Sequence, residues 1–163
     1  MKRFLTIVCV MFVAVSLGFS MSAKEVGKSL KSHKGDGYKF IKETEKDKSW
    51  KVEYEYSDTA YNVFILIADD VVNADDKNVV MYADVMVTDD QPSEEMLLKI
   101  LELNIEDSEW GFFSLYSGDS GWMIQYNIKF RLDALSDGSM YDAVQYIVEA
   151  ASYYNGSLSG SGE

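Results

Sequence analysis

The chain has 163 residues and carries 27 acidic against 15 basic side chains, with one histidine and one cysteine. An excess of negative charge on this scale repels nucleic acid, so we expect no nucleic-acid partner. The scarcity of histidine and cysteine excludes multi-histidine metal sites, zinc–thiolate sites and iron–sulfur clusters, and we expect neither a metal site nor a cofactor.

Residues 1–23 have the layout of a secretory signal peptide. Lys2 and Arg3 precede an apolar run over 4–19, and a segment rich in small residues follows it. The run is shorter than the ~20 residues of a spanning helix, so we expect no membrane anchor after leader removal. Cleavage after Ser22 or Ala23 would leave a periplasmic or secreted protein, whose formal net charge changes from −12 to −14 because two basic residues are lost.

The mature chain lacks the residues of a nucleophilic active site. Cys9 lies inside the leader, so the exported protein has no thiol and must fold without disulfides. His33 is the only histidine and lies in a segment that carries nine lysines between Lys24 and Lys51. We expect His33 to be solvated, this end of the molecule to be basic, and the protein not to be an enzyme.

The first half of the mature chain predicts strands. A short helix is expected over 24–33 and a weak strand over 38–44. Apolar and charged residues alternate over 50–56, the period of a half-buried antiparallel strand. Segments 61–68 and 79–87 are apolar on both faces, which is typical of central strands. Asp84 is the one charged interruption.

The second half predicts a helix, a hairpin and another helix. Pro92 breaks the sheet, and Ser93 is placed to cap a helix over 93–106. Segments 110–116 and 121–132 flank a turn-forming tetrad and predict a β-hairpin. A last helix follows over 137–156, and we expect residues 157–163 to be a disordered tail. The stripe expected to pack on the sheet from the first of these helices consists of Met96, Leu97, Ile100, Leu101 and Asn104.

Together these elements predict a single α+β domain over residues 24–156. The order is a three-stranded antiparallel meander, a helix, a β-hairpin and a C-terminal helix, with the helices packed on one face of a five-stranded sheet.

Three consecutive segments carry a resemblance to a known family. The leucine-rich helix over 96–104, the strand 110–116 and the long strand 122–132 resemble the core of the YbjN and type III secretion chaperone-like proteins, over Trp50 to Tyr154. The resemblance implies a non-enzymatic protein-binding architecture and a structural role for Asn104 at the helix end. Chaperones of that branch are cytosolic dimers that bind extended segments of secreted proteins, so the leader argues against a true secretion chaperone.

Aromatic residues on the strands are the candidate binding positions. Two or three helices cover only one face of a five-stranded sheet, so apolar side chains on the other face are left for a protein or peptide partner, or for a second copy in a homodimer. The positions that we single out for these contacts are Tyr54, Tyr61, Phe64, Tyr82 and Trp122.

Two other interpretations stay open. One is a small hydrolase or a lipid- or ligand-handling protein with a pocket near Asp84, which would act with a tyrosine. The other is a periplasmic enzyme inhibitor that inserts its acidic hairpin, with Ser117-Gly118-Asp119 at the tip, into a basic cleft. The paired acids between Asp69 and Asp76 could bind calcium weakly, although a solvated turn explains them better.

Overall fold

The computed structural model describes residues 21–70, 73, 75–106, 111–118 and 121–159. The predicted leader, apart from its last three residues, lies outside this part of the chain. The described elements are, in chain order, α2 (Ala23–Ser32), β1 (Tyr38–Glu45), β2 (Ser49–Tyr56), β3 (Thr59–Asp69), β4 (Lys77–Thr88), α3 (Glu94–Glu106), β5 (Phe112–Gly118), β6 (Gly121–Arg131), a 3-10 turn (Leu132–Ala134) and α4 (Asp137–Leu158).

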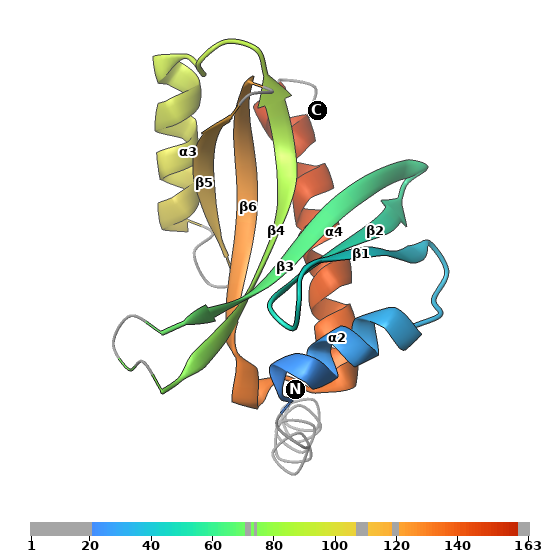
Figure 1. Ribbon diagram of the computed structural model, residues 1–163. Helices are drawn as coiled ribbons and strands as arrows, with labels where there is room; N and C mark the ends of the chain where they lie inside the picture. Colours follow the sequence, from blue (N-terminus) through green and yellow to red (C-terminus); the bar gives the residue numbers. More distant parts are fainter. Residues whose placement is uncertain (1–20, 71–72, 74, 107–110, 119–120, 160–163) are drawn as a thin grey trace, which may run out of the picture.

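The strands form one open antiparallel sheet in the order β1-β2-β3-β4-β6-β5 (Figure 1). The predicted α+β class is therefore confirmed. The meander has four strands instead of three, because residues 38–45 pair with β2 along most of their length. Tyr38 lies opposite Tyr54 and Phe40 opposite Val52, so the few apolar residues of β1 extend the apolar side of a stronger neighbour.

Helix α4 covers one face of the sheet. It lies behind the strands in Figure 1 and contacts β2, β3, β4 and β6. Alternate residues of the strands are fully buried against it, as the period of two requires. These residues include Val52 on β2, Val63 and Ile65 on β3, Val79, Met81 and Ala83 on β4, and Ile124, Tyr126 and Ile128 on β6.

Helix α4 extends two residues beyond the predicted end at 156. Its first turn is capped by Ser136, whose hydroxyl accepts from the backbone N–H of Ser139. Ala151, Tyr154 and Leu158 continue the buried side at helical spacing, and Leu158 is 7% exposed. The apolar contact of Leu158 therefore outweighs the turn signal of Gly156, so residues 157 and 158, which were expected in the tail, belong to the helix. Residues 160–163 lie outside the described part.

Helix α2 packs on the same side as α4, over Trp50. A capping box between Ser22 and Glu25 starts the helix. A Cβ atom on Gly27 would lie 2.9 Å from the indole Nε1 of Trp50, which shows how closely the helix backbone approaches the ring. His33 is half-buried after the helix, with its ring stacked on Tyr141 at 3.5 Å between centroids. The expectation of a solvated histidine holds only in part, because this aromatic contact covers one face of the ring.

Helix α3 does not lie on the face that α4 covers; its main contacts are with the edge strand β5 (Figure 1). Ser93 caps it as predicted, since its hydroxyl accepts from the N–H of Met96. Asn104 accepts from the backbone N–H of Phe113 at 2.5 Å and donates to its carbonyl at 3.3 Å. Both outward backbone groups of one β5 residue are thus satisfied, which confirms the structural role expected for Asn104 and protects this part of the sheet edge.

Replacing Asn104 by alanine should lower the free energy of unfolding by about 2 kcal/mol, because two half-buried backbone groups of Phe113 lose their partner. Urea titration measures the loss. Hydrogen exchange at the Phe113 amide should accelerate in the same variant while exchange in β2 and β3 changes only by the global loss. An unchanged Phe113 exchange rate would contradict the edge-protecting role.

Candidate protein-binding face

The sheet face opposite α4 carries a row of side chains that crosses five strands. Strand register places Lys51, Phe64, Tyr82, Asn127 and Phe112 next to one another, from β2 through β3, β4 and β6 to β5. We call this side of the sheet the open face, since α4 packs on the other side and α3 lies along the β5 edge. The row forms because these positions alternate with the buried ones along each strand.

Two of the predicted binding residues meet in this row. The rings of Phe64 and Tyr82 stack with 5.0 Å between centroids and an interplanar angle of 12°. The ammonium group of Lys51 lies 5.3 Å from the Phe64 centroid, in cation–π range. Burial, followed by the nearby Asp84 and Tyr116, raises the pKa of the Tyr82 phenol above its usual value. The Tyr82 hydroxyl can donate a hydrogen bond to a partner on this face, which also carries Lys51 and Asn127.

The other three predicted residues lie elsewhere. Tyr54 and Tyr61 face each other across β2 and β3 on the side of the sheet that carries α4, and both pack against the hydrophobic core. Trp122 lies opposite Thr88 at the far end of β6, in line with the buried Ile124. The structure thus brings Phe64 and Tyr82 together and separates them from Tyr54, Tyr61 and Trp122.

Several exposed apolar residues were missed by the sequence interpretation. Phe112 and Tyr116 on β5 are 45% and 56% exposed, and Val87 on β4 is 54% exposed. Val87 and Tyr116 flank Met123 in the register, so they extend the apolar surface along the open face. Alternation along the first hairpin strand could have identified Phe112 and Tyr116, because both lie on the opposite side of the strand from the buried Phe113.

Asp84 lines a cavity where the sheet splits. Strands β3 and β4 pair only from Val63 and Ala83 to Asp69 and Lys77, and their other ends diverge (Figure 1). The opening has a volume of about 480 Å³, and Asp84 and Tyr61 both line it. The carboxylate of Asp84 accepts from the Gln125 amide at 2.9 Å. This arrangement can bind a polar group, while a histidine or cysteine nucleophile is missing from the cavity's described lining.

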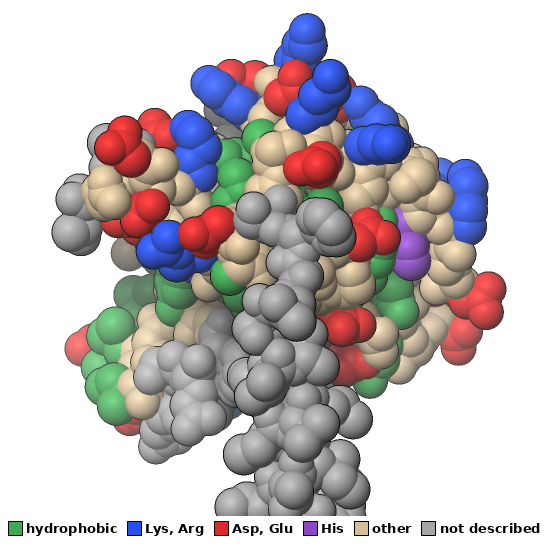
Figure 2. Space-filling model, turned by 90° about the horizontal axis from the view of Figure 1, so that it is seen from below, with side chains coloured by type: hydrophobic (Ala, Val, Ile, Leu, Met, Phe, Trp, Pro, Cys, Tyr) green, Lys and Arg blue, Asp and Glu red, His purple; other side chains and the backbone are tan. Residues whose placement is uncertain are grey.

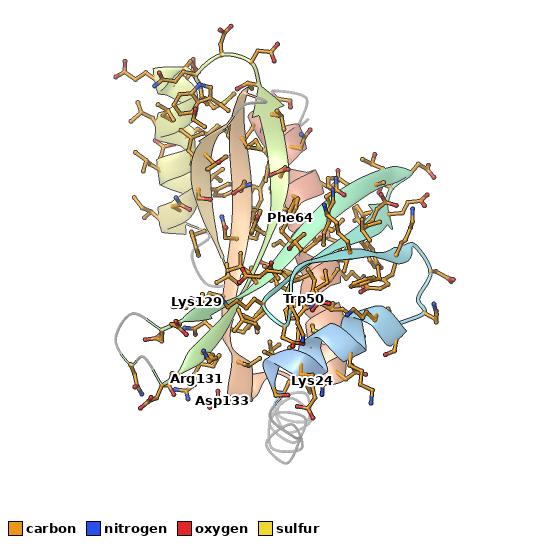
Figure 3. All side chains as sticks on the ribbon, viewed as in Figure 1. Lys24, Trp50, Phe64, Lys129, Arg131 and Asp133 are labelled. Carbon is orange, nitrogen blue, oxygen red and sulfur yellow. The ribbon has the colours of Figure 1, made fainter. Side chains whose placement is uncertain are left out.

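The acidic β3–β4 turn is held by ion pairs. Lys77, Lys129 and Arg131 pair with Asp69, Asp70 and Asp76, in that order. Figure 3 shows Lys129, Arg131 and Asp133 together at this end of the sheet. Hydrogen bonding to Lys77 lowers the pKa of Asp69, and hydrogen bonding to Arg131 lowers that of Asp133. Within the described residues, no group of three or more His, Cys, Asp or Glu side chains is arranged to hold a metal ion.

The view from below shows Lys and Arg side chains over the end that carries α2 and the β3–β4 turn, with Asp and Glu between them (Figure 2). The described ion pairs lie on α2, on strands β1 to β4 and their turns, and on β6 and the segment that follows it. Ion pairs therefore compensate part of the charge at this end of the molecule.

No protein-family model and no curated protein matches this chain. Among the residues that the structure describes, no helix combines the length and apolar character needed to cross a membrane. The predicted hairpin tip at Asp119, on which the inhibitor interpretation depends, lies outside the described residues, as does the predicted strand start at Trp110.

Proposed function

We propose that this chain is an exported, non-catalytic protein-binding domain, and that its partner docks on the open face. The observation that carries the proposal is the stacked pair of Phe64 and Tyr82, together with the exposed Phe112, Tyr116 and Val87 on the same side. Exposed apolar side chains gathered on one face of a domain are typical of an interaction site. Aromatic residues dominate the energetics of such sites because they bury a large area at little entropic cost.

The resemblance to the YbjN and secretion chaperone-like proteins supports the same class of function. It implies binding of protein segments without catalysis, and the leader directs the activity to the periplasm or the exterior. The ligand-handling alternative is supported by the cavity at Asp84 and Tyr61, but that cavity is open and mainly polar. The open face carries the stacked aromatic pair and the exposed Phe112 and Tyr116, so protein binding is the function we favour.

A paired substitution tests the proposal. The variant with Phe64→Ser and Tyr82→Ser should bind the protein's partner at least tenfold more weakly, since two central aromatic contacts are lost. The partner is isolated from envelope extract on the immobilised mature protein, identified by mass spectrometry, and its affinity then measured with purified components.

The matched control is Tyr153→Ser, because Tyr153 is 69% exposed on α4, away from the open face. Its affinity for the partner should equal that of the wild type. Circular dichroism and thermal unfolding establish that both variants are folded. Equal binding by the paired variant and the wild type, with both folded, would refute the open face as the binding site.

A further inference from the structure

Helix α3 has a second apolar side that nothing in the described chain covers. Leu98, Leu101 and Ile105 are 54%, 58% and 78% exposed. Their spacing of three and four residues places them in one line along the helix. We call this line the α3 ridge. Leu101 was expected to pack on the sheet, and its exposure corrects that expectation: the inward side is formed by Met96, Ile100, Leu103 and Asn104.

The ridge adjoins the open face. Asn104 points to the β5 edge, Met96 and Leu103 pack against the core, and Lys99, next to Leu103 around the helix, donates to Ser157 on α4. With 3.6 residues per turn, Leu101 lies next to Asn104 around the helix, on the side away from Met96 and Leu103. That side is the one to which β5 directs its exposed aromatic rings.

The charge around the ridge is negative and uncompensated. Glu95 and Glu102 precede and follow Leu98 by three and four residues, so both flank it, and both are exposed. Neither forms an ion pair with any described residue. Lys99 is the single basic residue of α3, and its ammonium group donates to the carbonyl of Ser157 on α4.

A second copy of this chain fits the ridge poorly. Packing of the ridge on itself about a twofold axis would bring the carboxylates of Glu95 and Glu102 close to those of the other copy. Like charges juxtaposed in an interface cost several kcal/mol. A partner that places Lys or Arg opposite these carboxylates would replace this repulsion with attraction between opposite charges.

The geometry of the ridge favours a helix over a strand as the partner element. Addition of a strand is disfavoured at the start of β5, because Asn104 already occupies the outward N–H and carbonyl of Phe113. A helix instead can pack its own side chains into the grooves beside the ridge. We propose that the α3 ridge binds a cationic amphipathic helix of a partner protein. This proposal names the partner's chemistry and rests on the proposed function of the adjoining open face.

Two synthetic peptides test the proposal on the mature protein. Both are helical and carry leucines at i, i+3 and i+7 repeats, and one has lysine at the remaining positions where the other has glutamate. The lysine peptide should bind, as followed by fluorescence anisotropy, and the glutamate peptide should bind at least tenfold more weakly. Equal binding of the two peptides would overturn the proposal.

Substitutions then locate the binding. Leu98→Ser with Leu101→Ser, and separately Glu95→Gln with Glu102→Gln, should each weaken binding of the lysine peptide at least tenfold. The controls are Tyr153→Ser for the apolar pair and Asp142→Asn for the acidic pair, both at exposed sites on α4, and both should bind as the wild type does. Binding that survives both ridge variants would show a general attraction to the acidic protein and overturn the proposal.

Two further outcomes separate this proposal from the proposed function. If the Phe64 and Tyr82 variant loses the natural partner while both ridge variants keep it, the open face stands and the ridge proposal falls. If sedimentation equilibrium shows a dimer that the leucine variant converts to a monomer, the occupant is a second copy and the cationic-helix proposal falls.

Discussion

Replacing Trp50 by alanine should lower the free energy of unfolding by about 3–5 kcal/mol, the largest loss expected for any single aromatic truncation in this chain. Trp50 is 0% exposed and lies on β2 opposite Ile65, with the backbone of α2 passing over its ring at Gly27. Truncation leaves a cavity, and α2 could fill it only by moving away from α4. Equilibrium unfolding in urea measures the change. It is monitored by circular dichroism, whose signal does not depend on the removed tryptophan.

Two companion variants make the result specific. Tyr153→Ala removes an aromatic ring that is 69% exposed, and it should cost less than about 1 kcal/mol. Gly27→Ala forces a methyl group against the indole and should also destabilise the protein, whereas Gly156→Ala on α4 meets no atom within 4 Å. Unfolding of Trp50→Ala at the same urea concentration as the wild type would contradict the close packing of α2 on β2.

Replacing Gly111 by alanine is expected to destabilise the protein by about 3 kcal/mol. A Cβ atom at this position would lie 2.5 Å from the phenol carbon Cζ of Tyr126 and 2.6 Å from the backbone carbonyl of Asn127. Tyr126 is 1% exposed and its ring packs against Phe113 and Tyr154, so it has no free space into which to move. The chain must instead shift β5 relative to β6.

Gly138→Ala is the matched control for Gly111→Ala. Gly138 lies in the first turn of α4, and an added Cβ there meets no atom within 4 Å. Alanine in a helix is favoured over glycine by up to about 1 kcal/mol, so this variant should be neutral or slightly more stable. Thermal melts compare the two directly, and equal melting temperatures for both would contradict the close approach of Gly111 to Tyr126.

The strands with a strong pattern were predictable from the sequence. Alternation over 50–56 and the apolar runs around residues 65 and 83 located β2, β3 and β4 within a few residues. The edge strand β1 has few apolar residues, and residues 42–45 include one lysine and two glutamates. It is held as a strand by pairing with β2, a tertiary interaction that local pattern does not contain.

The faces of the candidate site were harder to predict. Strands β3 and β4 are apolar on both sides, so alternation alone does not say whether Tyr61 or Phe64 points to α4. The register shift between Asp84 and Met86 adds a further change of side along β4. The position of α3 depends on its apolar contacts and on the hydrogen bonds of Asn104 to the β5 edge. Helical periodicity is the same for a helix on a face and a helix beside an edge, so the sequence pattern does not distinguish the two.

The capping box of α2 lies at the predicted leader cleavage site. The hydroxyl of Ser22 accepts from the N–H of Glu25, and the Glu25 carboxylate accepts from the N–H of Ser22 at 2.7 Å. A signal peptidase that cuts after Ser22 or Ala23 removes one half of this reciprocal pair, which is worth about 1 kcal/mol, and leaves a positive amino group at the positive end of the helix dipole. Cleavage at the predicted site would therefore leave the first turn of α2 about 1 kcal/mol less stable than it is in the full-length chain.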